Sequence, residues 1–132
     1  MNADIEAILK TAENNNPVLK NGSVREVFEE AAEKTGAEIE INGDKMIPMD
    51  REYFCQAVLC LLDNAAKYKT EGSKIVVKIS PKDIVISNRT GKDKFTPGTG
   101  IAIAERILEH HKLKLKTELK DGVFEARISK NS

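Results

Sequence analysis

The sequence predicts an α/β (α+β) two-layer sandwich, in which a mixed, mainly antiparallel sheet carries about three helices on one face. From residue 23 onward, helix-like and strand-like segments follow each other in the order α-β-α-β-β-α-β-β, so four of the five strands form hairpins instead of βαβ units. The last two strand-like segments alternate apolar and polar residues, which is typical of strands with one face on a core and one in water. The helices are then expected to cover the apolar face.

The expected helices have amphipathic patterns and recognisable end signals. They are placed at 3–14, 23–35, 51–69 and 99–111. Ser23 and Glu26 form a capping box at the start of the second helix, and Gly36 follows its end. Asp50 is the expected N-cap of the long third helix.

The expected strands are short β-rich runs bounded by turn residues. They are placed at 37–41, 74–80, 83–88, 113–119 and 123–129. Pro81-Lys82 and Asp121-Gly122 are the turns of two hairpins, and Asn42-Gly43-Asp44 is a further turn.

Length and composition indicate one soluble domain. The chain has 132 residues, with 21 basic and 21 acidic side chains, so no net charge attracts nucleic acid or an anionic membrane. No signal peptide opens the chain, and no apolar run could span a bilayer. Cys55 and Cys60 lie five residues apart on one helix and diverge too far for a disulfide, which favours a reducing cytoplasm. Residues 1–22 are expected to be an N-terminal helix and linker, and 23–132 the domain.

The long helix has two distinct sides. Its core side follows helical spacing: Phe54, Ala57, Val58, Leu61, Leu62 and Ala65. A second strip, Tyr53, Cys60, Asn64 and Lys67, lies at the edge of that stripe. An amide oxygen is a hard ligand for Mg²⁺ and an ammonium group attracts phosphate, so this flank suits a metal–phosphate ligand. The same spacing is also typical of solvated residues beside a core stripe.

A second signal lies in the stretch 96–107, TPGTGIAIAERI. Gly98-Thr99-Gly100 directly precedes the last helix, where glycines allow backbone N–H groups to approach a phosphate. The loop before it carries Arg89, Lys92 and Lys94 in an otherwise neutral protein. A Gly-x-Gly at a helix start is also typical of a plain N-terminal turn.

Taken in order, the two stretches resemble a known family. VLCLLDNAAKY (58–68) resembles the N-box of sensor histidine kinases, and GTGIAIAERILEHH (98–111) resembles their second glycine box. SVREVFEEAAEKTGAEIEI (23–41) resembles the lead-in helix and strand. The resemblance runs from about Ser23 to Ser129 and implies a histidine kinase-like catalytic, ATP-binding domain of the GHKL (Bergerat-fold) ATPases.

The resemblance assigns roles to particular residues. Asn64 would hold Mg²⁺ against ATP, Lys67 would contact phosphate, and these two are the implied catalytic residues. Tyr68 would border the nucleotide, and 89–98 would form a lid over it. The implied cofactor-binding residues are Asn64, Lys67, Tyr68, Asn88, Gly98, Thr99, Gly100 and Ile101, with Gly98 and Gly100 as hinge and phosphate-facing turn.

Several positions depart from the family pattern. Cys60 replaces the first Asn of the N-box, where related water-activating ATPases carry Glu, so efficient ATP hydrolysis is not expected. The first glycine box is reduced to SNRTG (87–91), with Asn88, or alternatively Ser87, at the position of the adenine-reading Asp. The lid is short, and Phe95 is the one candidate for the family's aromatic box. Some kinases that resemble peptide-pheromone receptors also have Asn after this strand.

The resemblance also implies partners. No phosphoacceptor motif is found in the sequence, and His110 and His111 are expected to be surface or capping residues at a helix end. The γ-phosphate would pass to a histidine on a dimerisation domain of the same receptor, with a response regulator downstream and no nucleic acid or direct membrane contact. The domain would be the cytoplasmic part of a membrane receptor, and 3–14 resembles the tail of a dimerisation helix.

Two other hypotheses about the function stay open. One is a degenerate GHKL-fold module used for protein–protein interaction without phosphotransfer, which Cys60, Asn88 and the short lid favour. The other is a serine kinase of the anti-sigma-factor type, against which Cys60 argues, because that family carries Glu at this position.

Overall fold

The structure is a computed structural model that describes residues 18–92, 94–96 and 98–130. Its helices are α2 (Val24–Thr35), α3 (Arg51–Tyr68) and α4 (Thr99–His110). Its strands are β1 (Lys20–Ser23), β2 (Ile39–Asn42), β3 (Met46–Met49), β4 (Ile75–Ile79), β5 (Asp83–Arg89), β6 (Leu113–Lys120) and β7 (Val123–Lys130). Within these residues, no helix is both long and apolar enough to cross a bilayer.

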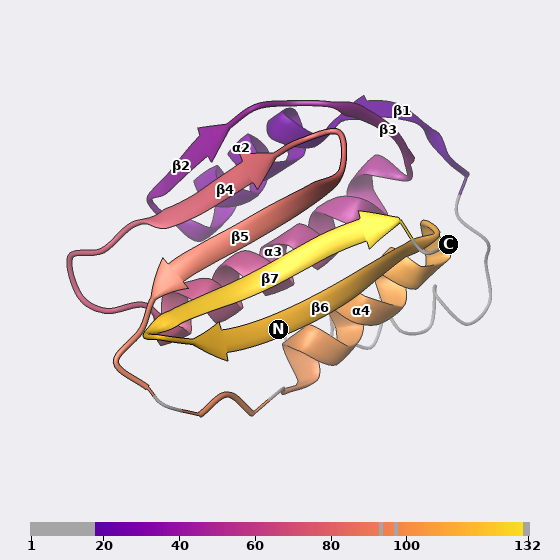
Figure 1. Cartoon of the computed structure of the whole chain (residues 1–132). Helices are drawn as coiled ribbons and strands as arrows, with labels where there is room; N and C mark the ends of the chain where they lie inside the picture. Colours follow the sequence, from indigo (N-terminus) through magenta and orange to yellow (C-terminus); the bar gives the residue numbers. More distant parts are fainter. Residues whose placement is uncertain (1–17, 93, 97, 131–132) are drawn as a thin grey trace.

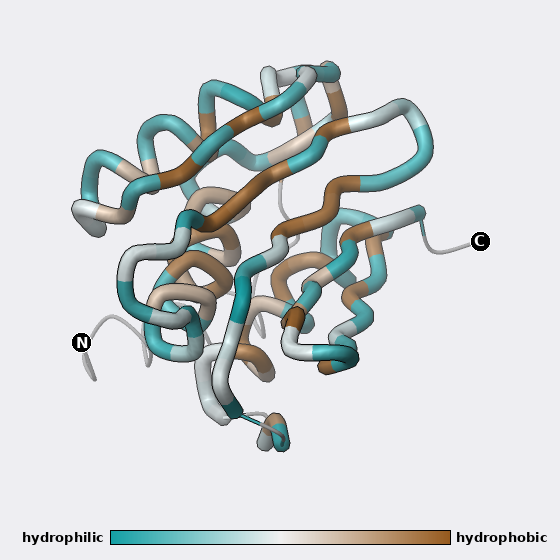
Figure 2. The backbone as a smooth tube through the Cα atoms, turned by 60° about the vertical axis from the view of Figure 1, so that its left-hand side comes forward, coloured by the Kyte–Doolittle hydropathy of each residue, from teal (hydrophilic) through white to brown (hydrophobic). Residues whose placement is uncertain are grey.

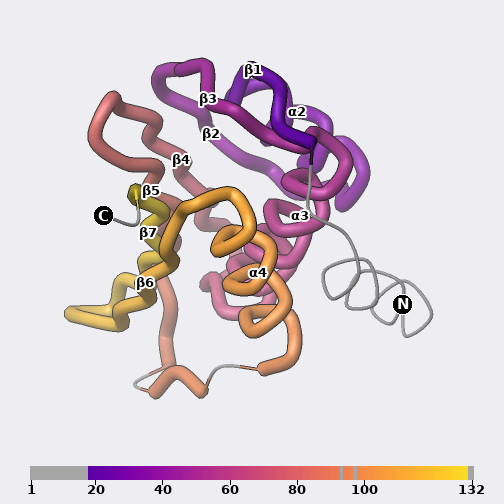
Figure 3. Tube along the Cα trace, turned by 90° about the vertical axis from the view of Figure 1, so that its right-hand side faces the viewer, coloured from indigo at the N-terminus to yellow at the C-terminus, as the bar shows by residue number. Residues whose placement is uncertain are grey.

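The main layer is a five-stranded sheet in the order β2-β4-β5-β7-β6, and β1 and β3 form a separate two-stranded sheet. In the five-stranded sheet β2 and β4 pair in parallel, and the other neighbours are antiparallel. Figure 1 shows the helices behind one face of this sheet, and the edge-on view in Figure 3 shows the same two layers. The predicted fold class, a mixed and mainly antiparallel two-layer sandwich, is confirmed.

Local sequence signals set the helix ends. The Ser23 hydroxyl accepts a hydrogen bond from the Glu26 backbone N–H at the start of α2, and Gly36 ends that helix in the left-handed region at φ 72°. The Asp50 carboxylate accepts from the Tyr53 N–H at the start of α3. Both predicted N-caps are therefore confirmed.

The C-terminal hairpin turns on Asp121 and Gly122, both with positive φ (53° and 74°). Two consecutive left-handed residues are the signature of the tight turn that matches the twist of a β-hairpin. The turn sets the register in which Leu119 lies opposite Phe124.

The small β1–β3 sheet was not predicted. Residues 20–22 of β1 fall in the segment that the sequence assigned to a linker, and β3 contains Pro48, which usually breaks strands. Each strand has four residues and pairs with the other alone, so neither has room to show an alternating pattern. The expected helix 3–14 lies outside the described residues.

One hydrophobic core joins the helices to the inner face of the sheet. Figure 2 shows hydrophobic stretches recurring along the central strands and along the helices that cover them. The six residues predicted as the core stripe of α3 are all buried. His111 also lies in this core, with 5% of its surface exposed, and is the C-cap residue of α4. Its capping role was expected, but a surface position for it was wrong.

Candidate functional site

The predicted strip on α3 divides into two parts. Tyr53 is buried, and its ring lies 6.1 Å from the His110 ring and 5.7 Å from the His111 ring, at the far end of α4. It therefore belongs to the core and not to a groove. Asn64 is half-buried and Lys67 is exposed, near the other end of α3. On α3, the candidate site is therefore confined to the C-terminal half of the helix.

Asn64 presents an unsatisfied amide. Its Nδ2 is buried and has no hydrogen-bond partner among the described residues. A buried donor without a partner has a free-energy cost, so such groups in native structures call for an explanation. A ligand oxygen that accepts a hydrogen bond from this Nδ2 would remove the cost.

Asn88 is the second unsatisfied amide, at the end of β5. It is 3% exposed, and its Nδ2 donates a 3.2 Å hydrogen bond to the Arg89 carbonyl. Its Oδ1 is buried without a partner in the described part of the chain. With the amide nitrogen already engaged, Asn88 can offer a ligand one fixed acceptor.

The end of β5 is attached to the end of α3. The Thr70 N–H, just beyond the helix, donates a 2.8 Å hydrogen bond to the same Arg89 carbonyl. This bond holds the strand that carries Asn88 beside the helix that carries Asn64 and Tyr68.

The first turn of α4 has no side-chain cap among the described residues. Gly98 is its N-cap, with no side-chain hydrogen bond to the first turn and no acidic residue in that turn. The helix begins with a hydrogen bond from the Ala102 N–H to the Gly98 carbonyl. The free N–H groups of such a helix start are suited to an anion.

Neither glycine at this helix start is required by the fold. Gly98 does not have positive φ, and a Cβ there would meet nothing within 4 Å. A Cβ on Gly100 would lie at ordinary contact distance, 4.0 Å, from the Cβ of Cys60 on α3. The space beside both residues is therefore available to a ligand. Ile101, in contrast, is buried in the core and could offer a ligand its backbone N–H alone.

An aromatic cluster surrounds Tyr68 at the end of α3. Tyr68, Phe95 and Phe124 pack together, with ring centroids 5.3 Å (Tyr68–Phe95), 4.5 Å (Phe95–Phe124) and 5.9 Å (Tyr68–Phe124) apart. The Lys92 ammonium lies 4.7 Å from the centre of the Tyr68 ring. Two residues of the predicted lid therefore cover the tyrosine that was expected to border a ligand.

Two members of this arrangement were missed by sequence reasoning. Phe124 belongs to the apolar side of the alternating pattern in 123–129, but no local signal shows that it meets Tyr68. Lys92 was noted as part of a basic loop, and its place over an aromatic ring depends on how the loop folds back.

Both cysteines are free thiols. Burial, and secondarily the Asp63 carboxylate, raises the pKa of Cys60 to about 11. Burial, with a hydrogen bond to Glu30, also raises the pKa of Cys55 to about 11. Cys60 is thus a neutral thiol near pH 7 and cannot act there as a general base.

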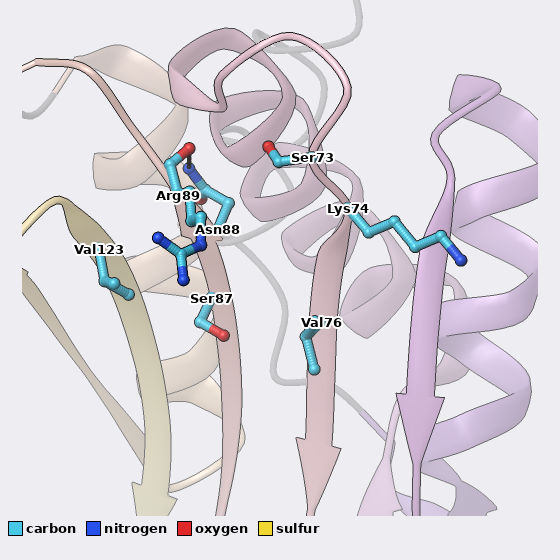
Figure 4. Close-up of a pocket in the computed structure, with 7 residues that line it drawn as sticks. All are labelled: Ser73, Lys74, Val76, Ser87, Asn88, Arg89 and Val123. Atoms are coloured by element: carbon cyan, nitrogen blue, oxygen red, sulfur yellow. Dashed lines mark hydrogen bonds between the residues drawn. The ribbon is translucent and has the colours of Figure 1, made fainter.

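A cavity of about 480 Å³ adjoins Asn88 on the opposite face of the sheet. It is lined by Ser73, Lys74, Val76, Ser87, Asn88, Arg89 and Val123. Figure 4 shows the Ser87, Arg89 and Val76 side chains on the face of the strands turned away from the helices. Besides Asn88, it includes Ser87, the alternative to Asn88, and Arg89, the first residue of the predicted lid, but no residue of α3 or α4. It is therefore not where these two helices meet.

Solved structures resemble this arrangement. The chain matches the cytoplasmic segment of the histidine kinase QseC with a TM-score of 0.77 and 16% identity, over 97% of this chain and 92% of that one. It matches the mycobacterial sensor histidine kinase MprB (TM-score 0.70, 22% identity, 86% and 97% covered) and the catalytic domain of the histidine kinase ThkA (0.57, 20%, 85% and 97%). No protein-family model and no curated protein matches the sequence.

These structures share little sequence with the chain, and the likeness is one of fold. The protein therefore has the fold of a sensor histidine kinase catalytic domain.

Proposed function

We propose that the protein binds ATP·Mg²⁺ and supplies the γ-phosphate to a histidine on a separate dimerisation domain of a two-component receptor. The fold supports this, and the observation that carries it is the buried, unpartnered Oδ1 of Asn88, beside the helix that carries the unpartnered amide of Asn64.

Asn88 fits the recognition of a purine base that carries an amino group. Its Oδ1 is fixed as an acceptor by the bond from Nδ2 to the Arg89 carbonyl. The exocyclic amine of adenine is a donor and would satisfy this atom. A carbonyl at the same place on a base would leave two acceptors facing each other, which is unfavourable.

Asn64 and the start of α4 fit the triphosphate. The Asn64 amide oxygen would be a hard ligand for Mg²⁺, and its unpartnered Nδ2 would donate to a phosphate oxygen. The N–H groups after Gly98 would donate to further phosphate oxygens. Among the described residues, no group of three or more His, Cys, Asp and Glu side chains could hold a metal. The ion would therefore take most of its ligands from phosphate and water, as Mg²⁺ commonly does. Exposed Lys67 would add a mobile positive charge.

The lid must rearrange for the base to reach Tyr68. Phe95 and Lys92 both contact its ring in this structure. A bound nucleotide would replace these contacts with stacking on the tyrosine, and Lys92 would then be free to approach the phosphates.

The chemistry asked of the protein is positioning and charge neutralisation. The bond between the γ-phosphorus and its bridging oxygen breaks, a bond to the acceptor histidine nitrogen forms, and ADP leaves. Water would be a poor competing acceptor, because the Cys60 thiol is neutral and cannot activate it. The partners are then the dimerisation domain of the same receptor and a response regulator, in the cytoplasm.

Isothermal titration with ATP·Mg²⁺ tests nucleotide binding. The chain is expected to bind, and Asn64→Ala is expected to abolish or strongly weaken binding, because it removes the metal ligand. Asp63→Ala is the matched control, since Asp63 is the exposed neighbour on the same helix. The proposal is wrong if the wild-type chain gives no binding heat, or if both variants bind like wild type.

A second function, a protein–protein interaction module without phosphotransfer, is favoured by the covered Tyr68 ring and the neutral Cys60. Adding the histidine-containing dimerisation domain and ATP distinguishes the two functions. Phosphohistidine on that domain supports the kinase, whereas nucleotide binding without transfer supports the interaction module.

A further inference from the structure

A groove of about 510 Å³ lies far from the proposed nucleotide site, between the β1–β3 sheet and the adjoining ends of β6 and β7. It is lined by Leu19, Ile47, Pro48, His111, Lys112, Leu113 and Lys130. Figure 3 looks onto this end of the molecule, where β1 and β3 lie above the C-terminal end of β7.

The groove is apolar and only partly covered. Leu19, Ile47 and Leu113 are half-buried. These partly exposed apolar side chains favour the docking of another apolar surface.

The rim of the groove is positively charged. Lys112 and Lys130 line it, and no acidic residue does. The two ammonium groups would attract an acidic partner.

The chain itself contains a segment with the complementary properties. Residues 3–14, ADIEAILKTAEN, precede the described residues, and their sequence predicts an amphipathic helix. Ile5, Ile8 and Leu9 share its apolar side. Asp4, Glu6 and Glu13 lie on the two borders of that side, roughly 80–100° from Ile5, whereas Lys10 lies roughly 140° from Ile5.

The connection is short enough to keep this segment at the groove. Asn14 is five residues from Leu19, which lines the groove, so the end of the segment lies within about 17 Å of that residue. A tether of this length gives a high effective concentration, so weak contacts suffice for docking.

We propose that residues 3–14 dock as an amphipathic helix in this groove. Ile5, Ile8 and Leu9 contact its apolar floor, and the bordering acidic residues face Lys112 and Lys130. Docking sets the position of the domain relative to whatever precedes it in the chain. Docking requires no nucleotide, so it can be correct or wrong independently of the proposed function.

Hydrogen exchange on the full 132-residue chain, without nucleotide, tests the docking. Backbone amides of 5–13 are expected to exchange at least tenfold more slowly in the wild type than in Ile8→Asp, which places a charge on the apolar side. Lys10→Asp, on the opposite side, is the matched control and should keep wild-type protection. Ile8→Asp should also speed exchange at Ile47 and Leu113, because the groove loses its cover. Rapid exchange of 5–13 in the wild type, or equal effects of the two variants, overturns the proposal.

The groove side offers a second test. Lys130→Glu should reduce protection of 5–13, whereas Lys116→Glu, elsewhere on β6, should not. A segment that is helical but undocked would slow its own amides and leave those of Ile47 and Leu113 unchanged, which overturns docking. Protection that rises with protein concentration, together with a dimer mass in sedimentation, would assign the groove to a second copy and also overturn it.

Discussion

His111 joins the end of α4 to the start of α3 through both ring nitrogens. The Asp50 backbone N–H lies 3.0 Å from Nε2, and the Ile107 carbonyl lies 2.8 Å from Nδ1. Since an N–H must donate and a carbonyl must accept, the proton is on Nδ1 and the ring is neutral. Protonation of Nε2 would break the bond to Asp50, the residue that caps α3.

This geometry predicts a pH-dependent stability. Burial lowers the pKa of His111 below its ordinary value of 6.5, against the favourable effects of the Ile107 carbonyl and the Asp50 charge. The contribution of the neutral ring is therefore present above about pH 6.5 and is lost as the pH falls through the lowered pKa. Thermal unfolding should show a Tm that declines more steeply from pH 7 to 5 in the wild type than in His111→Gln. His110→Gln is the control and should keep the wild-type slope. Parallel profiles for wild type and His111→Gln would contradict the prediction.

Asn88 gives a prediction with two opposite effects. In Asn88→Asp, a buried carboxylate without a partner should destabilise the free protein, as seen in urea unfolding. The same charged acceptor should tighten ATP binding by about 1 kcal/mol, or roughly fivefold, in titration calorimetry. Ser87→Asp is the control, since Ser87 lies on the other face of β5 and should leave the affinity unchanged. Weaker ATP binding by Asn88→Asp would show that Asn88 does not read the base.

The described residues of the lid contact two other elements of the fold. The segment after β5 is short, yet Phe95 reaches back to Tyr68 at the end of α3 and to Phe124 on β7. Aromatic contacts of this kind are worth about 0.5–1.5 kcal/mol beyond the area they bury. These contacts hold Phe95 against the proposed nucleotide site in this structure.

Removing the Phe95 ring should affect stability and ATP affinity in opposite directions, so the two effects can be measured separately. Phe95→Ala is expected to lower the free energy of unfolding by about 1 kcal/mol. It should also strengthen ATP binding roughly fivefold, because a nucleotide no longer has to displace the ring from Tyr68. Thr96→Ala, at the exposed next position, should change neither quantity. Weaker ATP binding by Phe95→Ala would mean that the ring holds the nucleotide instead of competing with it.

At the scale of the whole molecule, one core cluster includes residues of every described helix and of the five-stranded sheet. Unfolding should therefore be two-state. The chain has two tyrosines and no tryptophan, and Tyr53 and Tyr68 lie near opposite ends of α3. Tyrosine fluorescence and far-UV circular dichroism should give coincident urea transitions. Separate transitions would show that the two ends of the molecule unfold independently.

The sequence by itself determined the elements whose signals are local. The alternation of β6 and β7, the core stripe of α3, and the caps at Ser23 and Asp50 each depend on residues a few positions apart. Such patterns reflect helix and strand periodicity and the bonding needs of helix ends, so they can be read without knowing the fold. They were sufficient for the fold class.

The tertiary structure alone decided the contacts between distant segments. It paired β1 with β3, buried His111 against the start of α3, placed Phe95 over Tyr68, and left Asn64 Nδ2 and Asn88 Oδ1 without partners among the described residues. None of these has a local signal, because each depends on which side chains a folded chain brings together across tens of residues. The periodic pattern of a segment specifies which face it buries, and only packing specifies what that face meets.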